Sequence, residues 1–72
     1  MDRLRDLPIV ARAGDAVLLI EKKSDGIFLY EFRPDGFIGD TWHQSVADAK
    51  HQATYWWGDK VSEWRQVPAR CR

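Results

Sequence analysis

The same turn signal occurs twice in this chain, and it constrains the fold more than any other feature of the sequence. The two copies are Ser24-Asp25-Gly26-Ile27 and Pro34-Asp35-Gly36-Phe37. Asp-Gly between two apolar runs is typical of a β-hairpin, here with a three-residue loop that ends in a left-handed Gly. Pro34 suits the first corner because its φ is already set for that position. The sequence therefore predicts two consecutive hairpins.

The apolar runs around these turns predict the strands, because they are rich in β-branched and aromatic residues. Pro8 suits the start of a short edge strand, and Gly14-Asp15 is expected to be a turn. Pro68 ends an alternating segment that is expected to form the last strand. The expected strands cover residues 9–11, 16–22, 27–33, 37–42 and 61–67.

One helix is expected over residues 46–57. Ser45 is a good N-cap, Asp48 at the third helical position forms an acidic variant of the capping box, and Gly58 is the matching stop. The core-facing stripe of this helix is expected to hold Val46, Ala49, Ala53 and Trp57. The predicted fold class is α+β, an antiparallel sheet of three to five strands with one helix packed on one face, in the order (β)βββαβ.

The expected loop length fixes a register, and the register sorts the side chains between the two faces of the sheet. Lys23 would pair with Ile27, and Arg33 with Phe37. The face beneath the helix would then hold Leu18, Ile20, Phe28, Tyr30, Phe32, Ile38 and Trp42. The second face would hold Val17, Leu19, Ile27, Leu29 and Phe37, with Glu21, Glu31 and Arg33 at its rim.

This second face is the most informative surface that the sequence predicts, because one helix cannot cover both sides of a sheet. Either the N-terminal segment or the last strand folds over it, or it binds a partner or a second copy. Tryptophan is enriched at binding hot spots, so Trp56 and Trp64 are candidates to extend it, whereas Trp42 and Trp57 are expected in the core. The predicted interface residues are Val17, Leu19, Ile27, Leu29, Phe37, Trp56 and Trp64.

The sequence predicts no catalytic residue, metal ligand or cofactor site. Cys71 is the one cysteine, and no histidine pairs with it on a plausible scaffold. His43 and His51 have no third histidine to complete a metal site, so both are expected at the surface. Thr41 and His43 cluster with Asp40 at the end of a strand. These residues could suggest a catalytic site, but a cap at the entry to the helix explains them equally well. The chain is therefore expected not to be an enzyme.

The charge balance indicates which class of partner to expect. The 11 basic and 11 acidic side chains cancel, so no net field draws the chain toward nucleic acid. Its modestly basic tail carries the alternative function, a nucleic-acid-binding accessory domain. This tail consists of Lys60, Arg65, Arg70 and Arg72. Stacking of bases on the sheet is not expected, because its aromatic residues are predicted to lie beneath the helix.

We expect one small domain over residues 1–72, with residues 1–7 and 69–72 flexible. A single cysteine and the absence of a signal-peptide or membrane-spanning run favour a reducing, cytoplasmic setting without membrane contact. The sequence thus predicts a non-enzymatic protein-interaction or self-association module, either a homodimer or a domain that docks on another protein.

Overall fold

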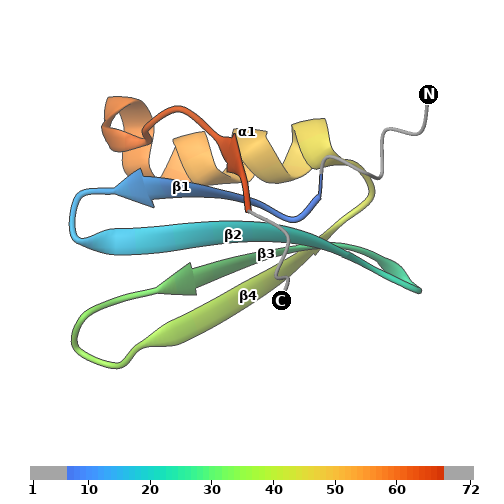
Figure 1. The fold of residues 1–72 in the computed structure, drawn as a ribbon, viewed down its shortest axis with the longest axis horizontal. Coiled ribbons are helices and arrows are strands. Elements are labelled where there is room, and N and C mark those ends of the chain that lie inside the picture. Colours follow the sequence, from blue (N-terminus) through green and yellow to red (C-terminus); the bar gives the residue numbers. More distant parts are fainter. Residues whose placement is uncertain (1–6, 68–72) are drawn as a thin grey trace.

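The strands of this protein form one antiparallel sheet, and an α-helix lies against one of its faces (Figure 1). The computed structural model describes residues 7–67. In chain order the elements are β1 (Ile9–Ala13), β2 (Ala16–Lys23), β3 (Gly26–Phe32), β4 (Ile38–His43), α1 (Val46–Trp57), the 3₁₀ helix η2 (Gly58–Lys60) and β5 (Arg65–Gln66). The order across the five-stranded sheet is β4-β3-β2-β1-β5. The predicted α+β fold is therefore confirmed.

Both ends of the described chain extend the sheet sideways. β1 pairs with β2, and β5 pairs with the free side of β1 through Val10 and Arg65. The last strand is shorter than predicted, because Val61 makes only an isolated bridge to Ala13. Leu7, predicted to be flexible, packs against the core. Residues 1–6 and 69–72, the remainder of the predicted flexible ends, lie outside the described residues.

The helix has the predicted bounds and the predicted stripe. Ser45 is the N-cap, and its Oγ accepts a hydrogen bond from the Asp48 N–H at 3.0 Å. Gly58 ends the helix with a φ of 61°, a conformation that glycine adopts without steric cost. Ala49 and Ala53 are completely buried, so the helix backbone can approach the sheet closely. Val46 and Trp57 pack against the same core.

The turn between β3 and β4 has the predicted geometry. The Gly36 N–H donates to the Arg33 carbonyl oxygen at 3.0 Å, and the Arg33 N–H donates to the Phe37 carbonyl oxygen at 3.0 Å. The left-handed residue is Gly36, with a φ of 97°. The predicted register of these strands is confirmed, since Phe32 pairs with Ile38.

The turn between β2 and β3 is one residue shorter than predicted. Lys23 pairs with Gly26 and not with Ile27, so the loop holds only Ser24 and Asp25. Because side chains alternate along a strand, this shift of one residue exchanges the faces of β3 relative to β2. The register between β3 and β4 is the predicted one, so the side chains of β4 change faces together with those of β3.

The predicted faces are consequently correct for β2 and wrong for β3 and β4. Leu18 and Ile20 lie beneath the helix as predicted, but their partners in β3 are Glu31 and Leu29. Ile27 and Leu29, predicted on the second face, are buried beneath the helix. The predicted members of the covered face that instead lie on the opposite side are Phe28, Tyr30, Phe32, Ile38 and Trp42.

Candidate binding surface on the uncovered face of the sheet

Paired residues of neighbouring strands point to the same side of a sheet, so the register defines the face that the helix does not cover. We call this the open face. One row across the strands is Val10, Leu19, Tyr30 and Asp40, and a second is Arg12, Val17, Phe32 and Ile38. A third row is Glu21, Phe28 and Trp42. Within residues 7–67, no helix or strand lies over these rows (Figure 1).

An aromatic stripe runs along β3 in the middle of the open face. The ring centroids of Phe28 and Tyr30 lie 6.2 Å apart, and those of Tyr30 and Phe32 lie 6.3 Å apart. The planes are inclined by only 19° and 25°, so the rings stand side by side along the strand. Phe32 is 37% exposed, and Phe28 and Tyr30 are half-buried by their neighbours in the sheet. The stripe presents aromatic area to whatever approaches this face.

Trp42 extends the stripe onto β4 and contacts the turn between β2 and β3. Its indole Nε1–H donates a hydrogen bond of 2.7 Å to the carbonyl oxygen of Asp25 in the turn. The indole occupies the space above Gly26, where a Cβ would collide with Nε1. Gly26 also has a φ of 148°, which other residues rarely adopt. Trp42 was predicted in the core, but it is 55% exposed.

Both signs of charge occur on the open face. The Lys23 ammonium lies 5.8 Å from the centroid of the Tyr30 ring and 3.6 Å from a carboxylate oxygen of Glu21. Interaction with the Tyr30 hydroxyl, followed by that with Glu21, raises the pKa of Lys23 above its ordinary value. Arg12 and Asp40 are exposed on the same face. The arrangement is an apolar centre with mixed charges around it, as at many protein interfaces.

A cavity of about 320 Å³ hollows the molecule where β1 meets β5. The Ser62 N–H donates to the Arg12 carbonyl oxygen at 2.7 Å, and the Arg12 N–H donates to the Ser62 Oγ at 2.9 Å. These two bonds hold the segment before β5 against β1. The cavity is lined by Val10, Ala11, Arg12, Val17, Ser62, Glu63 and Arg65. It continues the open face toward its β5 edge.

The structure separates the residues predicted to form the interface. Val17 and Leu19 lie on the open face, half-buried. Ile27 is 7% exposed and Leu29 is fully buried, so their assignment to an interface is wrong. Phe37 is 47% exposed but lies at the β3–β4 turn, outside the rows of the open face.

The two tryptophans predicted to extend the interface lie elsewhere. Trp56 belongs to α1 and is 37% exposed. Trp64 packs against the hydrophobic core beneath the helix. Neither therefore belongs to the open face.

Glu31 and Arg33 do not form a rim to the open face as predicted. Glu31 is 3% exposed and points toward the helix side, where its Oε2 accepts a hydrogen bond of 2.7 Å from Arg33 Nε. This hydrogen bond raises the pKa of the Arg33 guanidinium. Arg33 also lies 4.5 Å from the centroid of the Phe37 ring. Of the three predicted rim residues, Glu21 alone is on the open face.

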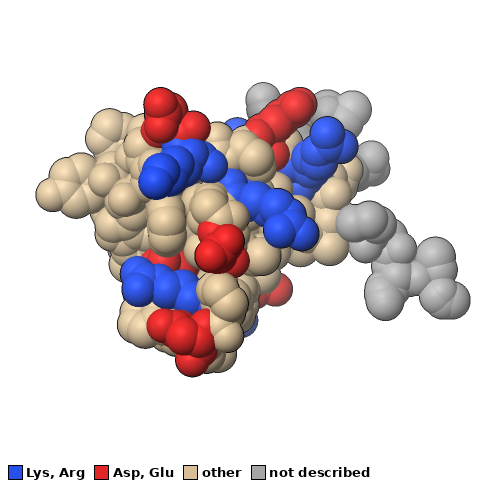
Figure 2. All heavy atoms as spheres, turned by 90° about the vertical axis from the view of Figure 1, so that its left-hand side faces the viewer, with Lys and Arg blue, Asp and Glu red and all other residues tan. Residues whose placement is uncertain are grey.

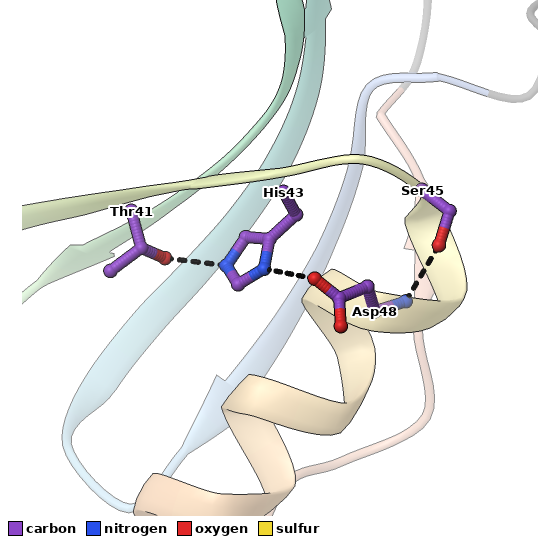
Figure 3. Close-up of polar contacts among 4 residues, drawn as sticks. All are labelled: Thr41, His43, Ser45 and Asp48. Atoms are coloured by element: carbon purple, nitrogen blue, oxygen red, sulfur yellow. Dashed lines mark hydrogen bonds and ion pairs between the residues drawn. The ribbon is translucent and has the colours of Figure 1, made fainter.

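A polar cluster of Thr41, His43 and Asp48 joins β4 to the first turn of α1 (Figure 3). His43 Nδ1 donates to Asp48 Oδ2 at 2.8 Å, and Thr41 Oγ1 lies 2.6 Å from His43 Nε2. With Nδ1 protonated, Nε2 is free to accept a hydrogen bond from the Thr41 hydroxyl. His43 is only 6% exposed, so its predicted surface position is wrong, whereas His51 is exposed as predicted.

The cluster is better suited to fixing the helix than to catalysis. A hydroxyl, an imidazole and a carboxylate in this order are the components of a hydrolytic triad. Here, however, the imidazole is buried and the cavity lies at the opposite edge of the sheet. Asp48 was expected to complete a capping box, but its carboxylate bonds to His43 and thereby ties β4 to the helix N-terminus. Among the described residues, no group of three or more potential ligands could hold a metal ion.

The basic tail is only partly within the described chain. Lys60 ends η2 and Arg65 lies in β5, both exposed. Arg70 and Arg72 fall outside the described residues. On the end of the molecule shown in Figure 2, basic and acidic side chains are interspersed, and neither sign dominates the view.

No protein-family model, curated protein or solved structure matches this chain. In the part of the chain that the structure describes, the helix is too short and too polar to cross a membrane. Any function must therefore be argued from the surface itself.

Proposed function

We propose that this protein is a small non-enzymatic interaction module that binds another protein chain, or a second copy of itself, through the open face. The observation that supports this is the aromatic stripe of β3, in which Phe32 is exposed and the other two rings are half-buried, on a sheet face without a covering element in residues 7–67. Contiguous exposed apolar patches commonly mark protein contacts. A reducing, cytoplasmic setting is part of this proposal, in keeping with the single cysteine of the chain.

Burial of the apolar centre would drive the association, at ~25 cal/mol for each Å² removed from water. Tyr30 and Trp42 are the natural anchors. Tyr30 combines a large apolar area with a hydroxyl that can bond to a partner, and Trp42, whose indole N–H already donates to Asp25, contributes exposed apolar area. Glu21, Lys23 and Asp40 at the margins would contribute specificity more than affinity. This division between an apolar centre and a charged margin is that of ordinary protein interfaces.

Binding of single-stranded nucleic acid is the second candidate, and the exposed stripe favours it more than the sequence does. Aromatic rings on an open sheet can stack successive bases. Phosphates, however, require a basic groove, whereas Glu21 and Asp40 place carboxylates on the face. The basic residues available beside the face are Arg12, Lys23 and Arg65. The mixed charge places this function second.

Photo-crosslinking in cells tests the proposal directly. A benzophenone amino acid would replace Tyr30 on the open face and, as the matched control, Tyr55 on α1, which is 81% exposed. We expect protein adducts from position 30 and few from position 55. The proposal is wrong if the two positions give equal adducts, if position 30 gives none, or if its adducts disappear on nuclease treatment. The last result would instead support the nucleic-acid function.

A further inference from the structure

One row of the open face is apolar in the middle and carries opposite charges at its two ends. In sheet order from β5 to β4 this row is Arg65, Val10, Leu19, Tyr30 and Asp40. Arg65 and Asp40 are exposed, and within residues 7–67 neither forms a hydrogen bond or ion pair with another side chain. Leu19 on β2 stands at the centre, with two strands on either side. If a second copy of this row is laid against the first in the opposite order, the basic end of each row therefore meets the acidic end of the other.

We infer that the partner of the open face is a second copy of this chain, related by a two-fold axis that runs along β2 between the two faces. Rotation about this axis reverses the order of the strands across the sheet, but each row of one copy still lies over the same row of the other copy. Arg65 of each copy then lies opposite Asp40 of the other, and Val10 lies opposite Tyr30. The same surface is used on both copies, as in most homodimers. This inference rests on the proposed function, since it names the partner of that same face.

The charges distinguish this arrangement from the other face-to-face dimer. A two-fold axis across the strands would place Arg65 against Arg65 and Asp40 against Asp40, which are repulsive contacts. The axis along β2 avoids both. It also brings the Arg12 guanidinium over Phe32 of the other copy, because they lie in one row on strands equally distant from β2. A guanidinium over an aromatic ring is an attractive contact.

The axis along β2 also brings together two pairs of like charges, because Glu21 and Lys23 both lie on β2 and on the open face. Glu21 lies on β2 and would face Glu21 of the other copy across the axis. Lys23 lies on the same strand, 3.6 Å from the Glu21 carboxylate, and would face Lys23 of the other copy in the same way. The two carboxylates and the two ammonium groups balance one another, so the open face of β2 carries no net charge across the axis.

The size of the face indicates that the dimer is weak. Five strands spaced ~4.8 Å apart, with about six residues of ~3.3 Å each, give a patch of roughly 20 by 20 Å. Stable interfaces bury about 800 Å² on each partner, so this patch is at the small end. The mass of the protein should rise with concentration rather than show a permanent dimer.

Charge reversal tests the inference on the full chain of 72 residues. The dissociation constant would be measured by sedimentation equilibrium over a concentration series. Asp40→Arg and Arg65→Asp should each weaken self-association by about tenfold or more, because two ion pairs per dimer become repulsive. The two variants mixed in equal amounts should associate as well as the unmodified chain, since in the mixed dimer each basic group at positions 40 and 65 again faces an acidic one. Asp59→Arg on η2 makes the same charge change away from the face and should have no effect.

The outcomes separate this inference from the proposed function. A monomer at all concentrations, or a mixture of the two variants that does not associate, would overturn the dimer. Protein adducts from position 30 would then still support the interaction module, with a different partner. Recovery in the mixture, with loss in each variant alone and an unchanged circular dichroism spectrum, would establish the axis along β2.

Discussion

The two faces of the sheet differ in the size of their side chains, and the larger rings lie on the exposed face. Beneath the helix the sheet presents Ala11, Ala13 and Ala16 beside aliphatic residues, and the helix meets them with Ala49 and Ala53. The opposite face carries three aromatic rings of β3 and an indole. The small side chains of the covered face let the helix approach the sheet closely, whereas the aromatic rings of the opposite face would hold a helix further away.

Adjacent residues of β3 give the largest expected difference between the faces. Leu29 is fully buried, and Leu29→Ala should lower the free energy of unfolding by about 2–5 kcal/mol because it leaves a cavity beneath the helix. Tyr30→Ala, one residue further on the open face, should cost about 1 kcal/mol or less in the dilute monomer. Urea denaturation followed by circular dichroism measures both values. Equal costs would contradict the assignment of the two faces.

The polar cluster of the covered face gives an intermediate effect. Thr41→Val keeps the side-chain shape but leaves Nε2 of the buried His43 without the hydroxyl 2.6 Å away. An unsatisfied buried polar atom costs about 1–3 kcal/mol, and we expect a loss of that order in thermal or urea unfolding. Thr54→Val on the exposed helix surface is the matched control and should change stability by less than about 0.5 kcal/mol. An equal loss in both variants would mean that the cluster adds nothing.

The smallest expected effect is on the pKa of Lys23 on the open face and on its contribution to stability. Because Tyr30 is the first cause of the raised pKa of Lys23, Tyr30→Phe should lower that pKa toward its ordinary value of 10.5. A raised pKa in the folded state stabilises the fold below the unfolded value and loses this contribution as the pH rises through the folded value. The advantage of the unmodified chain over Tyr30→Phe should therefore fade above about pH 10.5.

An NMR titration of the Lys23 side chain measures this shift. Tyr55→Phe, which removes an exposed hydroxyl from α1, is the control and should leave the Lys23 titration unchanged. A Lys23 pKa that is the same with and without the Tyr30 hydroxyl would show that the ring alone, or Glu21, sets it.

The features predicted correctly from the sequence depend on residues close together in the chain. Ser45 and Gly58 bound the helix, and the turn of Pro34, Asp35 and Gly36 is closed by backbone hydrogen bonds among Arg33, Gly36 and Phe37. Each of these signals acts over a few residues, so it can be recognised in the sequence without knowledge of contacts between distant residues. The fold class follows from such signals.

The assignment of the faces could not be predicted in the same way, because it depends on a distant contact. The first Asp-Gly turn resembles the second, but Trp42 lies over Gly26 and donates to Asp25, 17 residues earlier in the chain. A difference of one residue in the loop then exchanges the faces. The alternation of aliphatic Ile27 and Leu29 with aromatic Phe28 and Tyr30 was the available signal, together with the alanines of β1 and α1.

The position of Trp42 also gives the molecule its own optical reporter. Its indole is bonded to the turn by one edge while more than half of its surface is exposed. Removal of water from an indole shifts its fluorescence emission toward shorter wavelengths. In a chain whose other tryptophans are replaced by phenylalanine, the colour of the emitted light would report occupancy of the sheet without any added dye.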